Sequence, residues 1–386
     1  MSEAKLTQIH WSRAIFLVVY QLLLLSGLPV YFYYFTPKLS VVASTIVLLY
    51  ATGLSITMGY HRLYSHRTYR AHSSIEWILL FFGTMALEGS ALRWSYDHRM
   101  HHARVDTEDD PYSIKKGFWH AHFFWLFEKR PAIDPKVVPD LMKNPLVMFQ
   151  DKYYDGLAIS FNLIAFIVLG VILGDFLGSF VLITWTRIFL LHHFTWFINS
   201  LAHWWGEKPF NKELSAVDNY FIALLTFGEG YHNYHHTFAN DYRNGICWFH
   251  FDPSKWLIWS LHKVGLASGL KQVDPYTIKR KMVIEDRNEL MEQIKEYWHA
   301  KKEELEKEVH EISEQLIKKI NDFGQLKERY AQLKKEQVEP IIIQEFRSQI
   351  RDLSRSLKAD WAEWSKLCDQ IMNEISQAQL TQLKAT

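Results

Sequence analysis

Nine histidines fall in short groups whose spacing suits metal binding. The segment YHNYHH at 231–236 places three within five residues, at positions i, i+3 and i+4, which share one face of a helix and could serve a single target. HRLYSH and DHRMHH contribute five more, and NSLAH one. A neutral imidazole is the commonest protein ligand for a transition metal. The candidate ligands are His61, His66, His98, His101, His102, His203, His232, His235 and His236.

This ligand set limits the number and kind of metal ions. Nine imidazoles exceed the about four to six ligands that one ion accepts, so they suit two ions. Ligation by nitrogen without thiolate indicates Fe, Cu, Zn or Ni rather than Mg or Ca. Cys247 and Cys368 are far apart and form neither a disulfide framework nor a cysteine-based metal site. Carboxylates expected to accept the second ring N–H of ligands lie near the clusters: Asp106, Glu108, Asp109, Glu229 and Asp241.

One competing metal pattern is present. Glu-x-x-His occurs at Glu229/His232 and at Glu296/His299, and two such motifs are typical of soluble carboxylate-bridged di-iron bundles. Glu296 belongs to a charged segment near the C-terminus, however, and this reading leaves most of the clustered histidines without a role. The histidine groups are therefore the better candidate site.

Long apolar segments must position these histidines. Residues 14–35 and 39–60 carry no charge, and 157–174 and 179–205 form a second pair. Each segment is long enough to cross about 30 Å of hydrocarbon, which takes about 20 residues. A pair of buried core helices is the alternative, but two such runs back to back make it unfavourable. The aromatic content of 15% also suits a membrane interface.

Four spans in two hairpins fix which segments share a side of the membrane. The N-terminus, residues 61–155 and everything after about residue 205 lie on one side, and 61–155 is rich in Arg and Lys, which predicts a cytoplasmic location. All nine histidines fall on that side. We predict an all-α protein with four transmembrane helices and a helical cytosolic cap holding a dimetal site. The net charge of +1 gives no reason to expect a nucleic-acid partner.

The C-terminal part, 285–386, differs in composition from the membrane domain expected at 1–280. Apolar residues recur every three or four positions from Leu305 to Leu333 and again from Phe346 to Ile375, with Pro340 between the two series. This pattern predicts two amphipathic helices in an antiparallel hairpin, or a coiled-coil surface through which the chain self-associates.

The flanks of the histidine groups carry a resemblance. The segments RWSYDHRMHHARVDTEDDPY, NSLAHWWGEKPF and GEGYHNYHHTFANDYRNG are similar to the membrane fatty acyl-CoA desaturases of the delta-9, stearoyl-CoA type, over about residues 14–270. The resemblance implies that the nine histidines bind two Fe ions, which zinc often replaces in crystals. It further implies that Asn199 holds a water on one ion, and that Asp97, Lys129 and Arg130 contact the substrate.

The same resemblance implies an activity. It is the O₂-dependent insertion of a cis double bond into the saturated chain of an acyl-CoA. The electrons would come from a cytochrome b5 or ferredoxin type donor on a separate chain. The protein would be an integral multi-pass protein with both termini cytoplasmic, in the endoplasmic reticulum of a eukaryote or the inner membrane of a bacterium. No His-Pro-Gly-Gly signature of a fused cytochrome b5 appears in the sequence.

The chain also departs from the family. Tyr96 stands where the family often has Arg, and the loop before Lys129 and Arg130 is about one residue shorter. A fatty acid or alkane hydroxylase could share the histidine groups and remains an alternative. A metal transporter would need ligands inside the spans, whereas these lie at the span ends.

Overall fold

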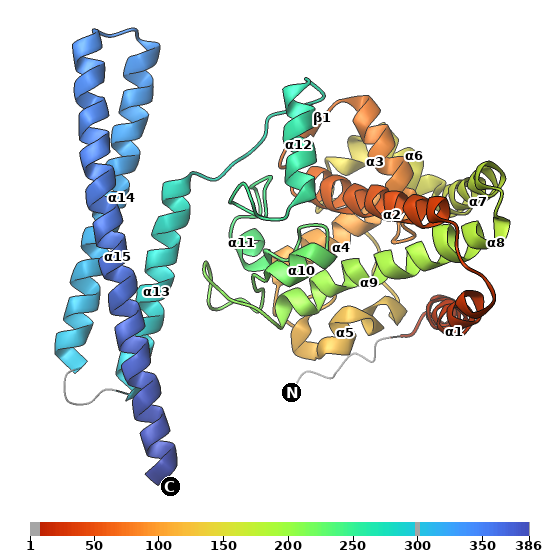
Figure 1. The fold of residues 1–386 in the computed structure, drawn as a ribbon, viewed down its shortest axis with the longest axis horizontal. Helices are drawn as coiled ribbons and strands as arrows, with labels where there is room; N and C mark the ends of the chain where they lie inside the picture. Colours follow the sequence, from red (N-terminus) through yellow and green to blue (C-terminus); the bar gives the residue numbers. More distant parts are fainter. Residues whose placement is uncertain (1–7, 298–301, 386) are drawn as a thin grey trace. The chain divides into compact units, whose positions relative to one another are not determined.

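The computed structural model describes residues 8–297 and 302–385, which are almost entirely helical (Figure 1). They form two compact units. The first consists of Met1–Lys208 and Leu214–Gln272, and the second of Pro209–Glu213 and Val273–Thr386. The predicted all-α class is confirmed, with one two-residue ladder, β1 (Arg70–Ala71) with β2 (Ala267–Ser268), as a small addition.

Four helices of the first unit are long and apolar enough to cross a membrane, as predicted. They extend over Trp11–Tyr34, Leu39–Ser65, Tyr154–Leu173 and Phe176–His203. In element terms they are α1 (Trp11–Tyr34), α2 (Leu39–Leu54) with the π-helix η1 (Ser55–Ser65), α7 (Tyr154–Leu173), and α8 (Phe176–Gly178) followed by η5 (Ser179–Thr186), α9 (Arg187–Asn199) and η6 (Leu201–His203).

The two hairpin turns lie together. The Lys38 ammonium, in the turn between α1 and α2, donates hydrogen bonds to the carbonyls of Leu173 and Gly174 at 2.9 Å each. These carbonyls belong to the C-terminal end of α7, where carbonyls lack partners within the helix and a cation is favourable. Both hairpins therefore turn on the same side, and the other ends of all four helices lead toward the cap.

Short helices build the cap on both sides of the second hairpin in the sequence. Before it come α3 (Ser73–Met85), α4 (Ala91–Arg104), η2 (Ile114–Lys116), α5 (Phe118–His122), η3 (Phe124–Phe127), η4 (Leu141–Lys143) and α6 (Pro145–Lys152). After it come α10 (Tyr220–Leu225), α11 (His232–Thr237) and α12 (Pro253–Lys263). The apolar stretch 77–87 falls mostly in α3, which is too short to cross a bilayer.

The core of the first unit joins the second span to the cap. Leu49 and Ile56 of this span pack in one buried cluster with Leu79 of α3, Leu92 of α4 and Phe227. Gly53 provides space for this contact, because a Cβ there would lie 2.4 Å from the Phe227 ring. Phe227 itself has a φ of 56° and directly precedes the loop to α11. The contact between Gly53 and Phe227 thus fixes the position of the second span relative to the loop before α11.

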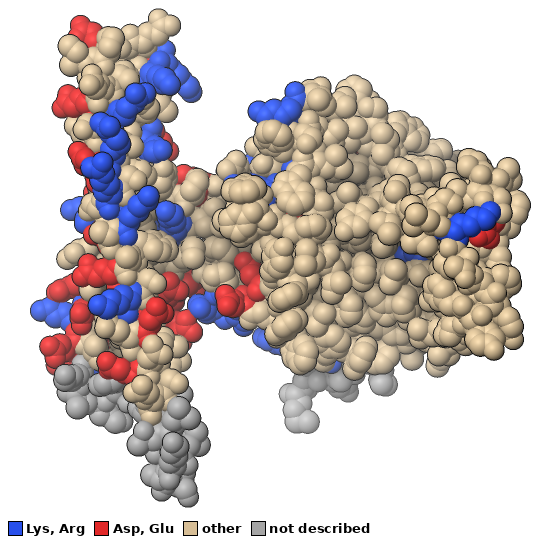
Figure 2. Space-filling view, in the orientation of Figure 1, with Lys and Arg blue, Asp and Glu red and all other residues tan. Residues whose placement is uncertain are grey.

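The second unit is a bundle of three helices. The predicted hairpin is present as α14 (Lys302–Lys335) and α15 (Pro340–Ala385), and a third helix, α13 (Pro275–Tyr297), packs against it. Leu290, Leu316, Ile320 and Trp364 are buried in its core. The segment Pro209–Glu213 belongs to this unit, since the Lys212 amide donates to Glu285. Charged side chains gather densely on α13–α15, as Figure 2 shows.

Candidate metal centre

The nine predicted histidines converge in two groups. In the first histidine cluster, His61, His66, His98, His102 and His235 place one ring nitrogen each within 4.8 Å of one another. The second histidine cluster, composed of His101, His203, His232 and His236, meets the same limit. Six of the nine side chains are buried, and the other three, His66, His102 and His236, are partly exposed. The fold therefore brings the nine histidines into two groups, each of which could hold a metal ion.

The spacing of the ring nitrogens fits a metal rather than a hydrogen-bonded histidine network. The Nε2–Nε2 distances are 2.9 Å for His61–His235, 2.8 Å for His66–His98, 3.0 Å for His102–His235, 3.1 Å for His232–His236 and 3.3 Å for His101–His236. One nitrogen that faces several others cannot donate a proton to all of them. Two ligands at about 2.1 Å from one ion and at right angles lie about 3 Å apart. The residues present fit two ions, with five imidazoles for one and four for the other.

The π-helix at the end of the second span explains the first histidine pair. On an α-helix, residues five apart point about 140° away from each other, because each residue turns by about 100°. Here the His66 N–H donates to the His61 carbonyl at 3.1 Å, a bond from residue i+5 to residue i. This wider turn brings His61 and His66 over one another. A spacing of four intervening residues is therefore suited to η1, and both rings join the first cluster.

The two HxxHH groups divide their histidines between the clusters. In α4, His98 and His102 join the first cluster and His101 the second; in α11, His235 joins the first cluster and the other two histidines the second. Residues four apart diverge by only about 40° on a helix, whereas adjacent residues diverge by about 100°. The expectation that His232, His235 and His236 serve a single target is thus wrong, and α4 and α11 each supply both clusters.

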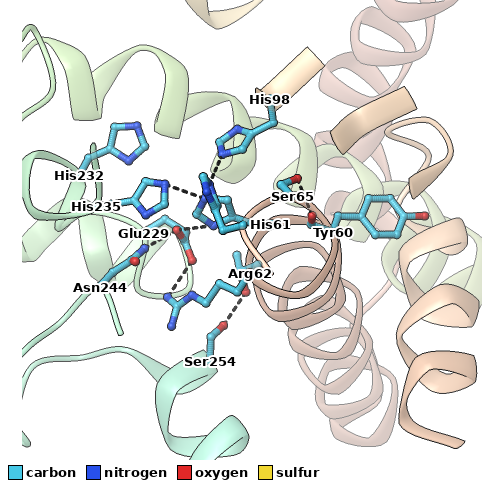
Figure 3. Close-up of polar contacts among 12 residues, drawn as sticks. Tyr60, His61, Arg62, Ser65, His98, Glu229, His232, His235, Asn244 and Ser254 are labelled. Atoms are coloured by element: carbon cyan, nitrogen blue, oxygen red, sulfur yellow. Dashed lines mark hydrogen bonds and ion pairs between the residues drawn. The ribbon is translucent and has the colours of Figure 1, made fainter. Parts of the chain in front are cut away.

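A buried carboxylate holds the outer nitrogen of His61. His61 Nδ1 lies 2.9 Å from Glu229 Oε2, and Glu229 also accepts from Arg62 at 2.9 Å and from Asn244 at 2.5 Å (Figure 3). Arg62 bonds Asp252 as well. Burial alone would raise the pKa of Glu229, but His61 and Arg62 hold it below its usual value. A charged Glu229 fixes the tautomer in which His61 Nε2 faces the cluster.

Three further hydrogen-bond partners of ligand histidines, each at the Nδ1 that faces away from the cluster, were not predicted from the sequence. His101 Nδ1 lies 2.8 Å from buried Asp110, and His98 Nδ1 lies 3.2 Å from the Tyr112 hydroxyl. His203 Nδ1 lies 2.7 Å from the Ser215 hydroxyl. Asp110 is adjacent to the predicted Asp109, so only the direction of each side chain distinguishes them. A hydroxyl partner such as Ser215 has no signal in the sequence.

The predicted carboxylates fall in different places. Glu229 contacts a ligand directly, and Asp106 reaches His203 through Ser215, whose hydroxyl donates to it at 2.5 Å. Asp109 is exposed and pairs with Arg104, which places it outside the clusters. Asp241 accepts from the Tyr234 hydroxyl and pairs with Arg243. The backbone carbonyl of Glu108 accepts a hydrogen bond from the Lys116 ammonium.

Burial keeps the ring nitrogens free for metal. It lowers the pKa of His98, His102 and His235 well below the ordinary value, and the charges of neighbouring imidazoles lower each pKa further. The same causes lower the pKa of His232 and His236. These rings are therefore neutral at physiological pH, which is the form that ligates a metal.

A cavity of about 1250 Å³ adjoins the first cluster. His61 and His98 line it, as do Asn199 and Trp94, whose indole stacks on the His98 ring with 4.9 Å between centroids. The predicted substrate contacts Asp97, Lys129 and Arg130 also line this cavity. One space thus extends from the histidines to charged side chains, as a long molecule with a polar head would require.

Comparisons with known proteins agree with this site. The sequence profile described as fatty acid desaturase matches residues 37–261. A probable acyl-CoA desaturase of Schizosaccharomyces pombe is 39% identical over 287 residues, which cover 72% of this chain and 59% of that protein. Acyl-CoA desaturase 1 of Saccharomyces cerevisiae is 36% identical, over 70% of this chain and 54% of that protein.

A relative whose name specifies an acyl chain bound to a lipid is also similar to this chain. The sn-2 palmitoyl-lipid 9-desaturase of Nostoc is 34% identical over 275 residues, which cover 69% of this chain and 92% of that protein. The chain spans little more than half the length of the two yeast relatives, and nearly all of the Nostoc one. The profile match alone covers more than half of the chain and includes all nine histidines. The chain therefore belongs to the fatty acid desaturase family.

Proposed function

We propose that this protein is an O₂-dependent desaturase that introduces a cis double bond into the saturated chain of a fatty acyl-CoA, at the delta-9 position. The observation that carries the proposal is the shared cavity, which brings His61 and His98 together with the cationic side chains Arg93 and Arg130. The yeast relatives are named acyl-CoA desaturases, and the name of the Nostoc relative specifies position 9.

The ligand set supports two iron ions as the working metals, with zinc able to occupy the same nitrogens. When bound, two irons supply the oxidant from O₂ that an unactivated C–H bond requires, given two electrons from outside. The protein holds the imidazoles through Glu229, Asp110 and Ser215 and keeps them neutral by burial. A reacting methylene pair would then have to lie beside these rings.

The cavity would select the reacting carbons by position. Its apolar lining includes Phe16, Leu17 and Ile56, which suit an alkyl chain, and the Trp94 indole lines it beside the His98 ring on which it stacks. A chain held by its polar head at the cationic side chains places one particular pair of methylenes beside the histidines. Such positioning favours reaction there over other carbons of the same intrinsic reactivity.

The membrane arrangement follows from the two hairpins. We infer that the histidine clusters and both termini are cytoplasmic, because the cap between the hairpins is rich in Arg and Lys. A cytochrome b5 or ferredoxin type donor on a separate chain would then approach from the cytosol. The apolar stripes of α13–α15 are buried within their own bundle, which favours a self-contained unit over self-association through these stripes.

Expression in a host that lacks its own desaturase tests the proposal. Fatty acids are analysed by gas chromatography and mass spectrometry. We expect a cis monounsaturated product from the native chain and none from His98→Ala inserted at equal level. A hydroxylated product would establish the alternative hydroxylase, and saturated acids alone, with two ions bound, would refute both oxidative functions.

A further inference from the structure

One loop joins a histidine of the second cluster to the hydrogen-bond partner of that same histidine. His203 is the last residue of η6, and Ser215, twelve residues later, lies 2.7 Å from its Nδ1 through the hydroxyl. The backbones of Glu207 and Asp218 exchange hydrogen bonds at 3.0 and 2.7 Å, which closes this part of the chain at its base. We call residues 204–214, which lie between His203 and Ser215, the His203 loop.

The Ser215 hydroxyl determines which nitrogen of His203 faces the second cluster. Its single proton is donated to Asp106 at 2.5 Å, so its oxygen can only accept a hydrogen bond from the imidazole. Nδ1 of His203 therefore carries the ring proton, and Nε2 keeps a free lone pair. Nε2 is buried and has no hydrogen-bond partner among the residues that the structure describes, as expected for an atom that faces a metal ion.

The middle of the His203 loop belongs to the second unit, whereas His203 and Ser215 belong to the first. The Lys212 N–H donates to Glu285 of α13 at 2.9 Å, and the Lys212 ammonium lies 2.9 Å from Glu289, one turn further along the helix. Only Leu214 separates residues 209–213 from Ser215. Helix α13 therefore holds a segment of chain that ends directly beside the partner of a metal ligand.

Glu285 is the stronger of the two attachments. Its side chain is buried, and besides the Lys212 N–H it accepts from the Lys281 ammonium at 2.6 Å. Hydrogen bonds to a charged group are stronger than those between neutral groups, and a buried carboxylate that loses a donor is unfavourable. The pair of Lys212 with Glu289 is about one third exposed on both sides, so water weakens it. Loss of the Glu285 carboxylate should therefore free the middle of the His203 loop.

The chain also enters the second unit from a point beside the first cluster. The Lys271 N–H donates to the Thr68 carbonyl at 2.8 Å, and Thr68 lies two residues after His66. The second unit resumes at Val273, so this anchored stretch leads directly into α13. The match to the family profile ends at residue 261, before this junction. A unit outside the matched region is thus joined to the chain next to residues of both clusters.

We propose that Glu285 and Lys212 are positioning residues for the second cluster, and that α13 holds the His203 loop closed so that Ser215 keeps His203 on its metal ion. This inference rests on the proposed dimetal centre and is independent of the substrate. Without the attachment to α13 the loop opens more often, and each opening moves Ser215 away from His203. The ion of the second cluster then leaves faster. The first cluster has no histidine in or beside this loop, so its ion stays.

Release of zinc to excess EDTA, from the full chain loaded with zinc in lipid nanodiscs, tests this proposal. The zinc that remains is measured by mass spectrometry at timed intervals. Glu285→Ala should release one of the two ions about 10-fold faster, the worth of one charge-assisted hydrogen bond, and leave release of the other unchanged. Glu285→Gln keeps an oxygen that accepts from the Lys212 N–H and should behave nearly as the native chain. Glu292→Ala, at an exposed position of the same helix, is the control and should match the native chain.

Hydrogen exchange reports on the loop itself. In the zinc-loaded chain, Glu285→Ala should raise the exchange rates of the amides of the His203 loop by about the same factor of 10, because both processes need the loop to open. The amides of α4 and α11 should keep their protection. Equal loss of protection in the loop, α4 and α11 would show general destabilisation and overturn the inference.

A double variant tests whether α13 acts through Ser215. Ser215→Ala removes the partner of His203 directly and should speed release of the same single ion. When it is combined with Glu285→Ala, the acceleration should be smaller than the product of the two separate factors, because both changes remove one interaction. Independent factors that multiply, or faster release of both ions from Glu285→Ala alone, would overturn the inference.

These measurements also separate the inference from the proposed function. Fewer than two zinc ions in the native chain would refute the dimetal centre and this inference together. Unchanged zinc release from Glu285→Ala, in a chain that holds two ions, would overturn the inference alone. A chain that holds two ions and shows the expected release, yet forms no double bond with stearoyl-CoA, would refute the desaturase activity and leave the inference standing.

Discussion

Glu229 and Asp110 provide a matched test of the two histidine clusters. Each accepts from the Nδ1 of one ligand, Glu229 from His61 in the first cluster and Asp110 from His101 in the second. Both carboxylates are buried, with exposures of 0% and 1%. Glu229→Gln and Asp110→Asn keep the shape and remove the charge. Loss of such an outer partner typically costs about 10- to 100-fold in metal affinity.

The structure limits the damage that each substitution causes. Arg62 retains Asp252, with contacts at 2.9 and 3.1 Å, when Glu229 becomes neutral. The cost to folding should therefore remain below the about 3–5 kcal/mol of a buried charge that loses its only partner. An affinity loss of 10- to 100-fold corresponds to about 1.4–2.7 kcal/mol, localised to one ion.

The assay is metal content after equilibration with graded concentrations of chelator, measured by mass spectrometry. We expect the native chain to retain two ions over a range in which each single variant retains one. The double variant should lose both ions with additive costs, since the substitutions affect different clusters. Asp109→Asn is the control, because Asp109 adjoins Asp110 in sequence but is exposed and pairs with Arg104.

Two outcomes would refute this reasoning. If Asp109→Asn weakens metal binding as much as Asp110→Asn, the direction of the side chains does not determine the outer partners. If Glu229→Gln combined with Asp110→Asn releases no more metal than either variant alone, both carboxylates act on one ion, and the division of the histidines between two ions is wrong.

Three further predictions concern residues around the clusters. Asn199→Ala should retain two ions by metal analysis yet lose activity, because its expected contact is through a water; loss of an ion would make it a direct ligand. Burial raises the pKa of Glu88 to about 7, so the folded state favours its neutral form. The unfolded chain loses this proton at a lower pH, so about 3 kcal/mol of stability is lost as pH rises from about 4.5 to 7. Glu88→Gln should flatten that part of the profile of thermal stability against pH, and an unchanged slope would exclude this assignment. Gly53→Ala should displace the Phe227 ring at a cost of about 1–3 kcal/mol, seen as a lower melting temperature that Phe227→Leu partly restores.

The sequence predicted the spans and the convergence of the nine histidines, because both depend on residue type. A helix that crosses lipid must be apolar over a fixed length, and the four runs meet this condition. Likewise, the spacing of the histidines predicts a metal site whatever the position of the segment in the fold. The third helix of the C-terminal bundle, α13, was harder to detect, because its buried Val283, Leu290 and Ile294 are separated by charged residues.

The division of the histidines between two clusters could not be predicted from the sequence, for a different reason. It depends on the angle at which each side chain leaves its helix, and His101 and His102 are neighbours with the same chemistry. The same limit applies to Asp109 and Asp110. Arg13, Arg93 and Arg130 line one cavity only because three distant segments meet, and neither spacing nor composition predicts that meeting.

The hydrogen bonds to the outer ring nitrogens have a consequence for how the protein is made. In small zinc domains the ion drives folding, so the chain has no stable form without it. Here Glu229, Asp110 and Ser215 orient three rings through hydrogen bonds within the protein, and the backbone bond from His66 to His61 orders a fourth histidine. We therefore expect the chain to fold before it receives metal. Metal supply would then change the fraction of chains that are loaded, while the total amount of folded protein stays unchanged.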